Sequence, residues 1–450
     1  MDDGPHGSRG KNALFLPGVN SAPMTRSPSV RTLRGRLRSR ALVPAVVVLT
    51  AGAMVLLGTS TLVASFVPGS VAAAATATSS CGSDSFYVAP SPLPKRPAGS
   101  IIRWRAGCDY LAPDVAAPAK AWNVLYLSTN ANDQPIAVSG TVLVPDTAWT
   151  GSGPRPLVAY ATGTQGWGNQ CAPSREMAVG DYDENFAVQN LLDQGWAVAV
   201  TDYPGLGTTG KELYAVNLAE GYAVLDILKA AEHLKAAGLS QSSPVAIEGY
   251  SQGGGAAAFA AQEAATYAKS LDLVGVAMGG TPANLQAVAD NLNGSAFFAF
   301  LGGAAIGFDN AYPQLHFSKY LNAAGKKAFK ELSGMCQEQG LVTFAFKKIQ
   351  DYTKGGINPI TLPPVEKVLD ENDAGGVAPT VPVLQYHGLA DEVIPYAVEV
   401  DLHDEWCALG VTSDLVPFPG DHVATQVEAQ VTVVQWIGDR FAGDAAPSNC

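Results

Sequence analysis

Short apolar runs alternate with longer amphipathic segments along most of the chain after residue 120. The runs predict strands at residues 121–127, 136–144, 156–161, 196–201, 245–247, 273–278, 381–385 and 411–417. The first two alternate between apolar and polar residues, as in an antiparallel hairpin, whereas most later runs are apolar throughout, as in strands covered on both faces. Longer segments predict helices at 186–194, 217–237, 256–269 and 423–441. The pattern therefore indicates an α/β fold, with a mostly parallel central sheet and helices on both faces.

Between about residues 285 and 376 this alternation stops, and the segment is helical without a clear strand. Such an insertion between two strands of an α/β sheet is most simply a helical cap over the carboxyl edge, where these folds bind ligands. We therefore divide the chain into a leader (1–77), an α/β core in two parts (78–284 and 377–450) and a cap (285–376). The apolar stretch Ser295–Phe308 is either the hydrophobic core of the cap itself or a wall that binds an acyl chain.

The first 77 residues have the composition of an export signal. Residues 1–40 contain eight Lys or Arg and two acidic residues, whereas residues 41–77 contain no charged residue. A basic region, an apolar run and a small-residue end predict a secretory signal, which we expect to be cleaved after Ala77. The apolar run is also long enough to cross a bilayer, so an uncleaved anchor is the alternative. The protein is expected to be exported, and either secreted or associated with the cell envelope.

The net negative charge of the chain disfavours one class of partner, the nucleic acids. The chain carries 28 basic and 40 acidic residues, and removal of the eight and two in the leader leaves a net charge of −18. An acidic surface repels phosphate backbones, and the sequence has no basic stripe with interleaved aromatic residues. We therefore expect no nucleic-acid partner.

Residues 244–254, PVAIEGYSQGG, join a short apolar strand to an Ala-rich helix. Within them, residues 249–253 match the pattern G-x-S-x-G, which forms a nucleophile elbow when a strand precedes it and a helix follows. The flanking glycines let the two backbones approach where a Cβ would clash. The helix N-terminus also favours negative charge that develops beside the serine. Ser251 is therefore predicted to be a catalytic nucleophile, and the alternative is an incidental turn in a glycine-rich chain.

A serine nucleophile needs a neutral imidazole to accept its proton, and the imidazole needs an acid that fixes its tautomer. Hydrolases with an α/β fold supply them in the order Ser, acid, His, each in a loop after a strand. Asp391 follows the 381–385 strand, and His422 follows the last predicted strand, so we predict the triad Ser251, Asp391 and His422. The weaker alternatives for the acid are Glu392 and Asp414, whereas Asp421 is expected to point away from His422. Ordinary structural roles are expected for the other histidines, which are His6, His233, His316, His387 and His403.

Acyl transfer also requires two N–H donors that stabilise the oxyanion. One is expected from the main chain of Gln252, the residue after the nucleophile. The other is expected from the TGTQG loop after the 156–161 strand, at Thr164, with Gln165 as the next choice. The alternative for this loop is a simple turn.

Six cysteines in an exported chain are expected to form disulfides. They are Cys81, Cys108, Cys171, Cys336, Cys407 and Cys450, and their spacing alone does not choose the connectivity. The chain contains no C-x-x-C and no H-x-x-x-H motif. No metal site is therefore predicted, and the triad requires no cofactor.

With these residues in view, the chain resembles the secretory lipase family of the α/β-hydrolases over residues 82–450. The resemblance rests on GYSQG at 249–253, CAPS at 171–174, DYPGLGT at 202–208, GGTPANL at 279–285, and the HGLAD and GDH motifs near the end. It implies the α/β-hydrolase fold and the triad Ser251, Asp391 and His422. It also implies the disulfides Cys171–Cys336 and Cys407–Cys450, which leaves Cys81–Cys108 as the third pair.

The resemblance implies a secreted serine carboxylester hydrolase, a lipase or esterase that cleaves fatty-acyl esters such as triacylglycerols through an acyl-enzyme on Ser251. Its partners would be lipid or small ester substrates, with transient contact between the cap and a lipid interface. The first alternative is an acyltransferase that uses the same triad but excludes water. The second is a non-catalytic surface protein of the same fold that acts by binding. An intact triad argues against the second.

Overall fold

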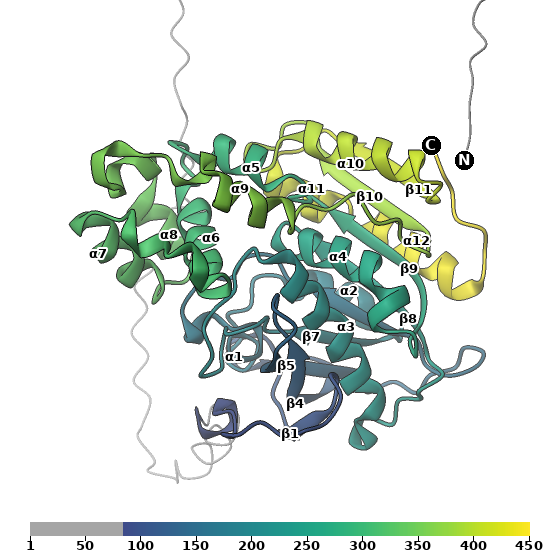
Figure 1. Ribbon diagram of the computed structural model, residues 1–450. Coiled ribbons are helices and arrows are strands. Elements are labelled where there is room, and N and C mark those ends of the chain that lie inside the picture. The colour runs from purple at the N-terminus through teal and green to yellow at the C-terminus, as the bar shows by residue number, and fades with distance from the viewer. Residues whose placement is uncertain (1–83) are drawn as a thin grey trace, which may run out of the picture. The chain divides into compact units, whose positions relative to one another are not determined.

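The structure is a computed structural model that describes residues 84–450. The predicted leader and Cys81 lie outside the described residues. A nine-stranded sheet runs through the described part (Figure 1). Its strands, in spatial order, are β1 (Ile101–Ala106), β4 (Ala119–Thr129), β5 (Pro135–Pro145), β7 (Ala197–Thr201), β6 (Leu157–Ala161), β8 (Pro244–Tyr250), β9 (Asp272–Gly279), β10 (Val383–Gly388) and β11 (Ser413–Phe418).

The pairing of neighbouring strands changes once across this sheet, from antiparallel to parallel. Strands β1, β4, β5 and β7 pair antiparallel, and β4 and β5 form the predicted hairpin. From β7 to β11 every neighbouring pair is parallel. A separate small hairpin pairs β2 (Tyr110–Ala112) with β3 (Val115–Ala116). The prediction of a mostly parallel sheet is therefore confirmed.

Alternate residues of the parallel strands enter two separate hydrophobic cores. On β6, Leu157 and Ala159 belong to one core, and Val158 and Tyr160 belong to the other. The first core also contains residues of α3 (Asn217–His233), α4 (Gln252–Tyr267) and α10 (Tyr396–Ala408). The second contains residues of α2 (Asn185–Asp193) and α12 (Gln430–Ala442). Burial of both strand faces explains why these runs are apolar throughout.

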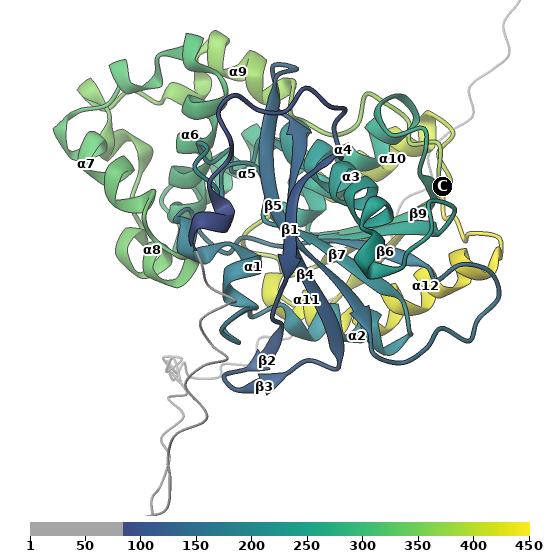
Figure 2. The same cartoon turned by 90° about the horizontal axis from the view of Figure 1, so that it is seen from below.

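Residues 280–382, all of them described, add no strand to the sheet between β9 and β10. Their helices α6, α7, α8 and α9 lie together on one side of the sheet in both Figure 1 and Figure 2. The segment has a hydrophobic core of its own, which Trp167 and Tyr214 from the preceding loops join. Its helices are α5 (Leu285–Leu292), α6 (Phe298–Ala311), α7 (Ala323–Leu332), α8 (Gln337–Phe344) and α9 (Pro363–Asp370). The boundaries 78–284, 285–376 and 377–450 stay a prediction.

The four predicted helices all differ from their predicted bounds. Helix α2 is shifted by one residue, and α3 ends at His233 rather than at residue 237. Helix α4 begins at Gln252 rather than at residue 256, because Gly253 lies where a Cβ would overlap the carbonyl oxygen of Ala161. The glycines that suggested a turn therefore permit close helix packing. The helix predicted at 423–441 is divided into α11 (His422–Glu428) and α12, since α11 packs against β10 whereas α12 packs against β9.

A short helix, α1 (Pro173–Glu176), follows the loop after β6. No helix of the described residues is both long enough and apolar enough to cross a membrane.

Candidate active site

Ser251 lies on a sharp turn between β8 and α4. Its backbone adopts φ 59° and ψ −121°, a left-handed conformation that a non-glycine residue rarely adopts. The backbone N–H of Ser251 donates to the carbonyl oxygen of Gly279 at 3.0 Å, which ties the turn to the end of β9. A Cβ at Gly249 would overlap the carbonyl of Gly253, so the turn requires glycine on its strand side. The sequence 249–253 thus folds into the geometry of a nucleophile elbow.

Three of the predicted site residues are hydrogen-bonded in series. The Oγ of Ser251 lies 2.9 Å from Nε2 of His422, and Nδ1 of His422 lies 2.7 Å from Oδ2 of Asp391. A carboxylate can only accept, so Nδ1 carries the proton and Nε2 accepts from the serine hydroxyl. The backbone of His422 is also held, because its carbonyl oxygen accepts from the Tyr250 hydroxyl at 2.7 Å.

The alternative acids do not reach the imidazole of His422. Glu392 accepts a hydrogen bond from the backbone N–H of His422 at 3.2 Å, and Asp414 lies within β11. Asp421 caps helix α11 by accepting from the N–H of Ala424 at 2.8 Å. The geometry thus favours Asp391 as the partner of His422.

Four donors surround the carboxylate of Asp391, whose side chain is fully buried. Oδ1 accepts from the backbone N–H groups of Val393 and Ile394 at 2.9 and 2.8 Å. Oδ2 lies near two imidazoles, those of His422 and His387. Burial alone would raise the pKa of the Asp391 carboxyl, but hydrogen bonds from the two histidines and the backbone hold it well below its usual range. Asp391 is therefore ionised at neutral pH.

His387 was interpreted from the sequence as an ordinary structural histidine, and its contact with Asp391 was missed. The signal that was available is the polar pair Gln385 and His387 inside β10, a strand whose six residues are all buried. Buried polar groups require hydrogen-bond partners, so such a pair indicates a polar network beneath the adjoining loop.

The two residues predicted to donate to the oxyanion are held through their side chains. Thr164 Oγ1 lies 2.8 Å from the Tyr214 hydroxyl, and Gln252 Nε2 donates to Glu220 Oε1 at 2.6 Å. The N–H of Gly163 donates to Glu184, whereas no hydrogen bond engages the N–H groups of Thr164 and Gln252 within residues 84–450. These two N–H groups are therefore unpaired within this part of the chain. The roles of Tyr214 and Glu220 were not predicted, because nothing local in the sequence links them to the loops they support.

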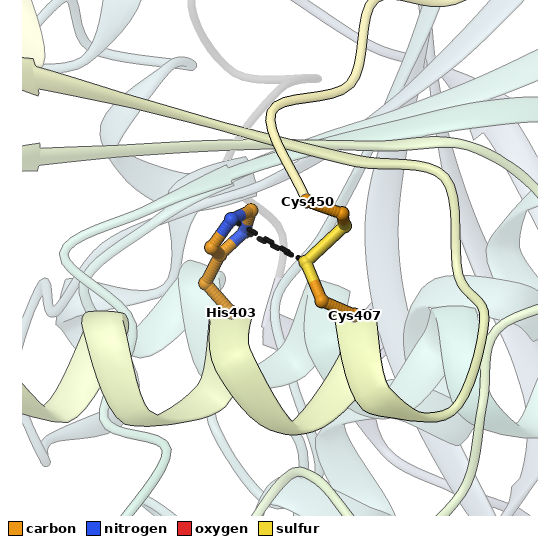
Figure 3. A group of neighbouring side chains, drawn as sticks. All are labelled: His403, Cys407 and Cys450. Atoms are coloured by element: carbon orange, nitrogen blue, oxygen red, sulfur yellow. Dashed lines mark hydrogen bonds between the residues drawn. A yellow bond between two sulfur atoms is a disulfide. The ribbon is translucent and has the colours of Figure 1, made fainter.

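Disulfides tie two predicted pairs of cysteines together. Cys171–Cys336 joins the loop after β6 to the cap, and the carbonyl oxygen of Gln165 accepts from the N–H of Gln337 at 3.0 Å beside it. Cys407–Cys450 joins α10 to the end of the chain (Figure 3). Both pairings confirm those implied by the family resemblance. Cys108 is also disulfide-bonded, and its predicted partner Cys81 lies outside the described residues.

Within the described residues, one group of side chains has the spacing to hold a metal ion, and it consists of His403, Cys407 and Cys450. Figure 3 shows that the two sulfur atoms are bonded to each other, with His403 Nε2 3.4 Å from Cys407 Sγ. A disulfide offers no thiolate, so this group does not fit a metal in the oxidised protein. His403 and Cys407 lie on α10 and Cys450 is the last residue, and none of the three belongs to the series Ser251, His422 and Asp391.

An apolar cavity is lined by Ser251 and Gln252 together with residues of α5, α6 and α9. Its lining includes Leu285, Val288, Phe300, Ala305, Leu315 and Val365. Both interpretations of residues 295–308 therefore have support. Phe298 and Ile306 belong to the core of the cap, whereas Phe300 and Ala305 line the cavity.

The sequence pattern of the family described as secretory lipase matches residues 175–449. Secreted triacylglycerol lipase LIP3 of Malassezia globosa is 29% identical over 385 residues, which cover 82% of this chain and 83% of that protein. A Mycobacterium tuberculosis protein named as a probable inactive lipase is 29% identical over 372 residues, which cover 80% of this chain and 82% of that protein. The crystal structure of Candida antarctica lipase A in its closed state has a TM-score of 0.73 and 26% identity, covering 81% of this chain and 87% of that one.

Proposed function

Because the chain belongs to the secretory lipase family, we propose that it is a serine carboxylester hydrolase that cleaves fatty-acyl esters, including triacylglycerols. The observation that carries the proposal is the hydrogen-bonded series Ser251, His422 and Asp391 beside an apolar cavity. A polar reaction centre in the wall of an apolar cavity suits an ester whose acyl chain is hydrophobic.

In the proposed reaction, Ser251 Oγ attacks the ester carbonyl carbon while its proton passes to His422 Nε2, 2.9 Å away. The carbon–oxygen bond to the alcohol then breaks, and His422 returns the proton to the leaving alkoxide. Water attacks the resulting acyl-enzyme, with His422 again as the base, and the fatty acid leaves. Asp391 keeps the imidazole in the correct tautomer and stabilises its charged form.

The N–H groups of Thr164 and Gln252 are proposed to donate to the oxyanion that forms in each step. Replacement Gln252→Pro removes one of these donors at the first residue of α4, where the missing N–H costs no hydrogen bond within the helix. We expect kcat to fall by about 10²- to 10³-fold. The matched control Gln252→Ala keeps the N–H and loses only the contact with Glu220, so it should lose less than about tenfold. Equal losses in two variants that melt like the wild type would contradict the oxyanion role.

The cavity is proposed to bind the acyl chain. Replacement Ala305→Phe on α6 would fill part of it, so kcat/KM for p-nitrophenyl palmitate should fall by about tenfold or more. Hydrolysis of p-nitrophenyl acetate should change little, because a two-carbon acyl group has no long chain to place in the cavity. Ala324→Phe on the exposed face of α7 is the control. A parallel loss with both esters would argue against this cavity as the acyl site.

Contact between the cap and a lipid interface is also proposed. Two apolar side chains at and just beyond the end of α8 support it, since Val342 is 83% exposed and Phe346 is 71% exposed. Depletion of the protein from water by a triolein emulsion tests this contact, and a protein that stays in the aqueous phase would contradict it.

Export of the chain is proposed because the relative from Malassezia globosa is named as secreted and residues 1–77 have the composition of a signal. N-terminal sequencing of the mature protein tests cleavage after Ala77. Recovery of the intact leader in the membrane fraction would favour the anchor instead.

Hydrolysis of p-nitrophenyl esters from acetate to palmitate is the direct test of the proposed function. Reaction of Ser251 with a fluorophosphonate is the second test, because it requires an activated serine but no turnover. A protein that fails both tests is a binding protein with a hydrolase fold. A protein that labels but transfers acyl groups to added methanol without releasing fatty acid is an acyltransferase.

A further inference from the structure

A second buried histidine lies directly beneath the proposed catalytic acid. His387, near the end of β10, has no exposed surface. Its Nε2 lies 3.2 Å from Oδ2 of Asp391 and 2.9 Å from the carbonyl oxygen of Ile394. Its Nδ1 lies 3.0 Å from Oε2 of Glu399 on α10. Oδ2 of Asp391 is therefore shared between two imidazoles, with His422 at 2.7 Å and His387 at 3.2 Å.

With Asp391 and Glu399 as carboxylates, the surroundings of His387 fit the imidazolium. Every atom that faces its two ring nitrogens is a carbonyl or carboxylate oxygen, and these atoms accept hydrogen bonds without donating them. A neutral imidazole has one N–H and would leave one of its nitrogens facing an acceptor without a hydrogen. The imidazolium has two N–H groups and satisfies both sides.

Glu399 is itself fixed by other groups. Its Oε2 accepts from the backbone N–H of Thr281 at 2.9 Å, and its Oε1 accepts from Gln385 at 3.0 Å. Glu399 has no exposed surface. His387 is thus the positive charge between two buried carboxylates, one of which is the proposed catalytic acid.

Other titratable groups lie around this arrangement. They are His422 on α11, Glu392 in the same loop as Asp391, Tyr250 at the end of β8, Tyr386 beside His387 on β10, and Tyr396 on α10. Among these groups only His422 can carry a positive charge, so His387 is the one other cation beside Asp391 in this set. Burial lowers the pKa of His387, but the hydrogen bonds and charges of Asp391 and Glu399 outweigh burial and raise it to about 10. His387 is therefore charged throughout the neutral range.

We propose that His387 is a positioning residue for the ester hydrolysis: as an imidazolium clamped between Asp391 and Glu399, it holds the Asp391 carboxylate ionised and turned toward His422. This inference rests on the proposed function of the triad. Its second consequence concerns Asp391, because a fixed positive charge beside this carboxyl keeps its pKa low. The proposed acid then stays ionised as the pH falls.

Two substitutions separate the charge of His387 from its hydrogen bonds. His387→Gln keeps an N–H donor but has no charge, and His387→Leu has neither. Both should move the acid limb of the pH profile of kcat/KM upward, because the Asp391 carboxyl loses the charged partner that helps to keep its pKa low. In His387→Leu, kcat should also fall by about tenfold or more with KM unchanged, since His387 contacts Asp391 rather than the substrate. His387→Gln should recover most of kcat while keeping the shifted limb.

The matched control is His403→Gln, which replaces another buried histidine of the same region. His403 contacts Gln385 and Ser413 and no member of the triad. This variant is expected to keep the wild-type pH profile even if its melting temperature falls. Folded His387 variants with the wild-type acid limb and wild-type kcat would overturn the proposal.

A measurement on the wild-type protein does not depend on how the variants fold. In the NMR spectrum, both ring N–H protons of His387 should be present from pH 6 to pH 9, as an imidazolium requires. A neutral ring with one N–H at pH 7 would overturn the proposal. If the wild type hydrolyses no ester although the imidazolium is present, the proposed function fails while the clamp between Asp391 and Glu399 stands.

Discussion

Replacement Ser251→Ala is expected to lower kcat for p-nitrophenyl ester hydrolysis by about 10⁶-fold, the largest effect of any single substitution in this chain. The proposed reaction begins with attack by Ser251 Oγ, and no other hydroxyl lies within hydrogen-bond reach of His422 Nε2 in residues 84–450. A residual acceleration over water, of about 10³- to 10⁴-fold, should persist because the oxyanion donors and the cavity are untouched. Initial rates at saturating ester, measured on the purified variant and wild type, provide the comparison.

The loss in this variant is expected without loss of the fold. Alanine keeps the Cβ that the turn already accommodates at φ 59°, and it removes a single hydrogen bond, the one to His422. The melting temperature should therefore stay within a few degrees of the wild type, as a change of about 1 kcal/mol implies. If the alanine variant hydrolyses ester at a tenth of the wild-type rate, the measured activity belongs to another site or to a contaminant.

Replacement Asp391→Asn is expected to lower kcat by about 10⁴-fold. The amide keeps the shape of the carboxylate, but it has no charge. One of its two terminal atoms is an oxygen, which accepts, and the other is a nitrogen, which donates. Oδ1 must still accept from Val393 and Ile394, which turns the amide nitrogen toward His422 Nδ1. Because the amide nitrogen donates, His422 must then carry its proton on Nε2, and it can no longer accept from Ser251.

The matched control for this prediction is Asp421→Asn. Asp421 is adjacent to His422 in sequence and has the same chemistry, but it caps helix α11 by accepting from Ala424. Asparagine caps helices as well as aspartate does, so activity and stability should both be close to wild type. A loss of about 10⁴-fold in Asp421→Asn with little change in Asp391→Asn would transfer the role of the acid from Asp391 to Asp421.

Comparison of Asp391→Asn with the His387 variants also shows which of the two imidazole contacts of the carboxylate contributes more to kcat. The contact with His422 is expected to govern the tautomer, and its loss costs about 10⁴-fold. The contact with His387 is expected to govern charge and orientation, and its loss costs about tenfold together with a shift in pH. An equal loss of kcat in His387→Leu and Asp391→Asn, both folded, would mean that the two contacts act as one unit.

The sequence by itself determined the fold class, because the order of apolar runs and amphipathic segments is a local property that burial on both faces requires. The elbow was predictable for a related reason. Its glycines, its serine and the flanking strand and helix lie within one short segment, so the local sequence specifies the backbone geometry of the turn. The positions of Asp391 and His422 shortly after strands β10 and β11 followed from the strand order along the chain.

The tertiary structure decided which polar groups meet. His387 and Glu399 lie twelve positions apart and come together with Asp391 only because α10 packs against β10. The hydrophobic periodicity of the sequence does not predict such a contact. Gln252 and Glu220 meet in the same way, across the packing of α3 on α4. The apolar stretch 295–308 was ambiguous in sequence because a cavity wall and a core are made of the same residues. Only the packing of α6 against its neighbours determines that Phe298 faces the core whereas Phe300 faces the cavity.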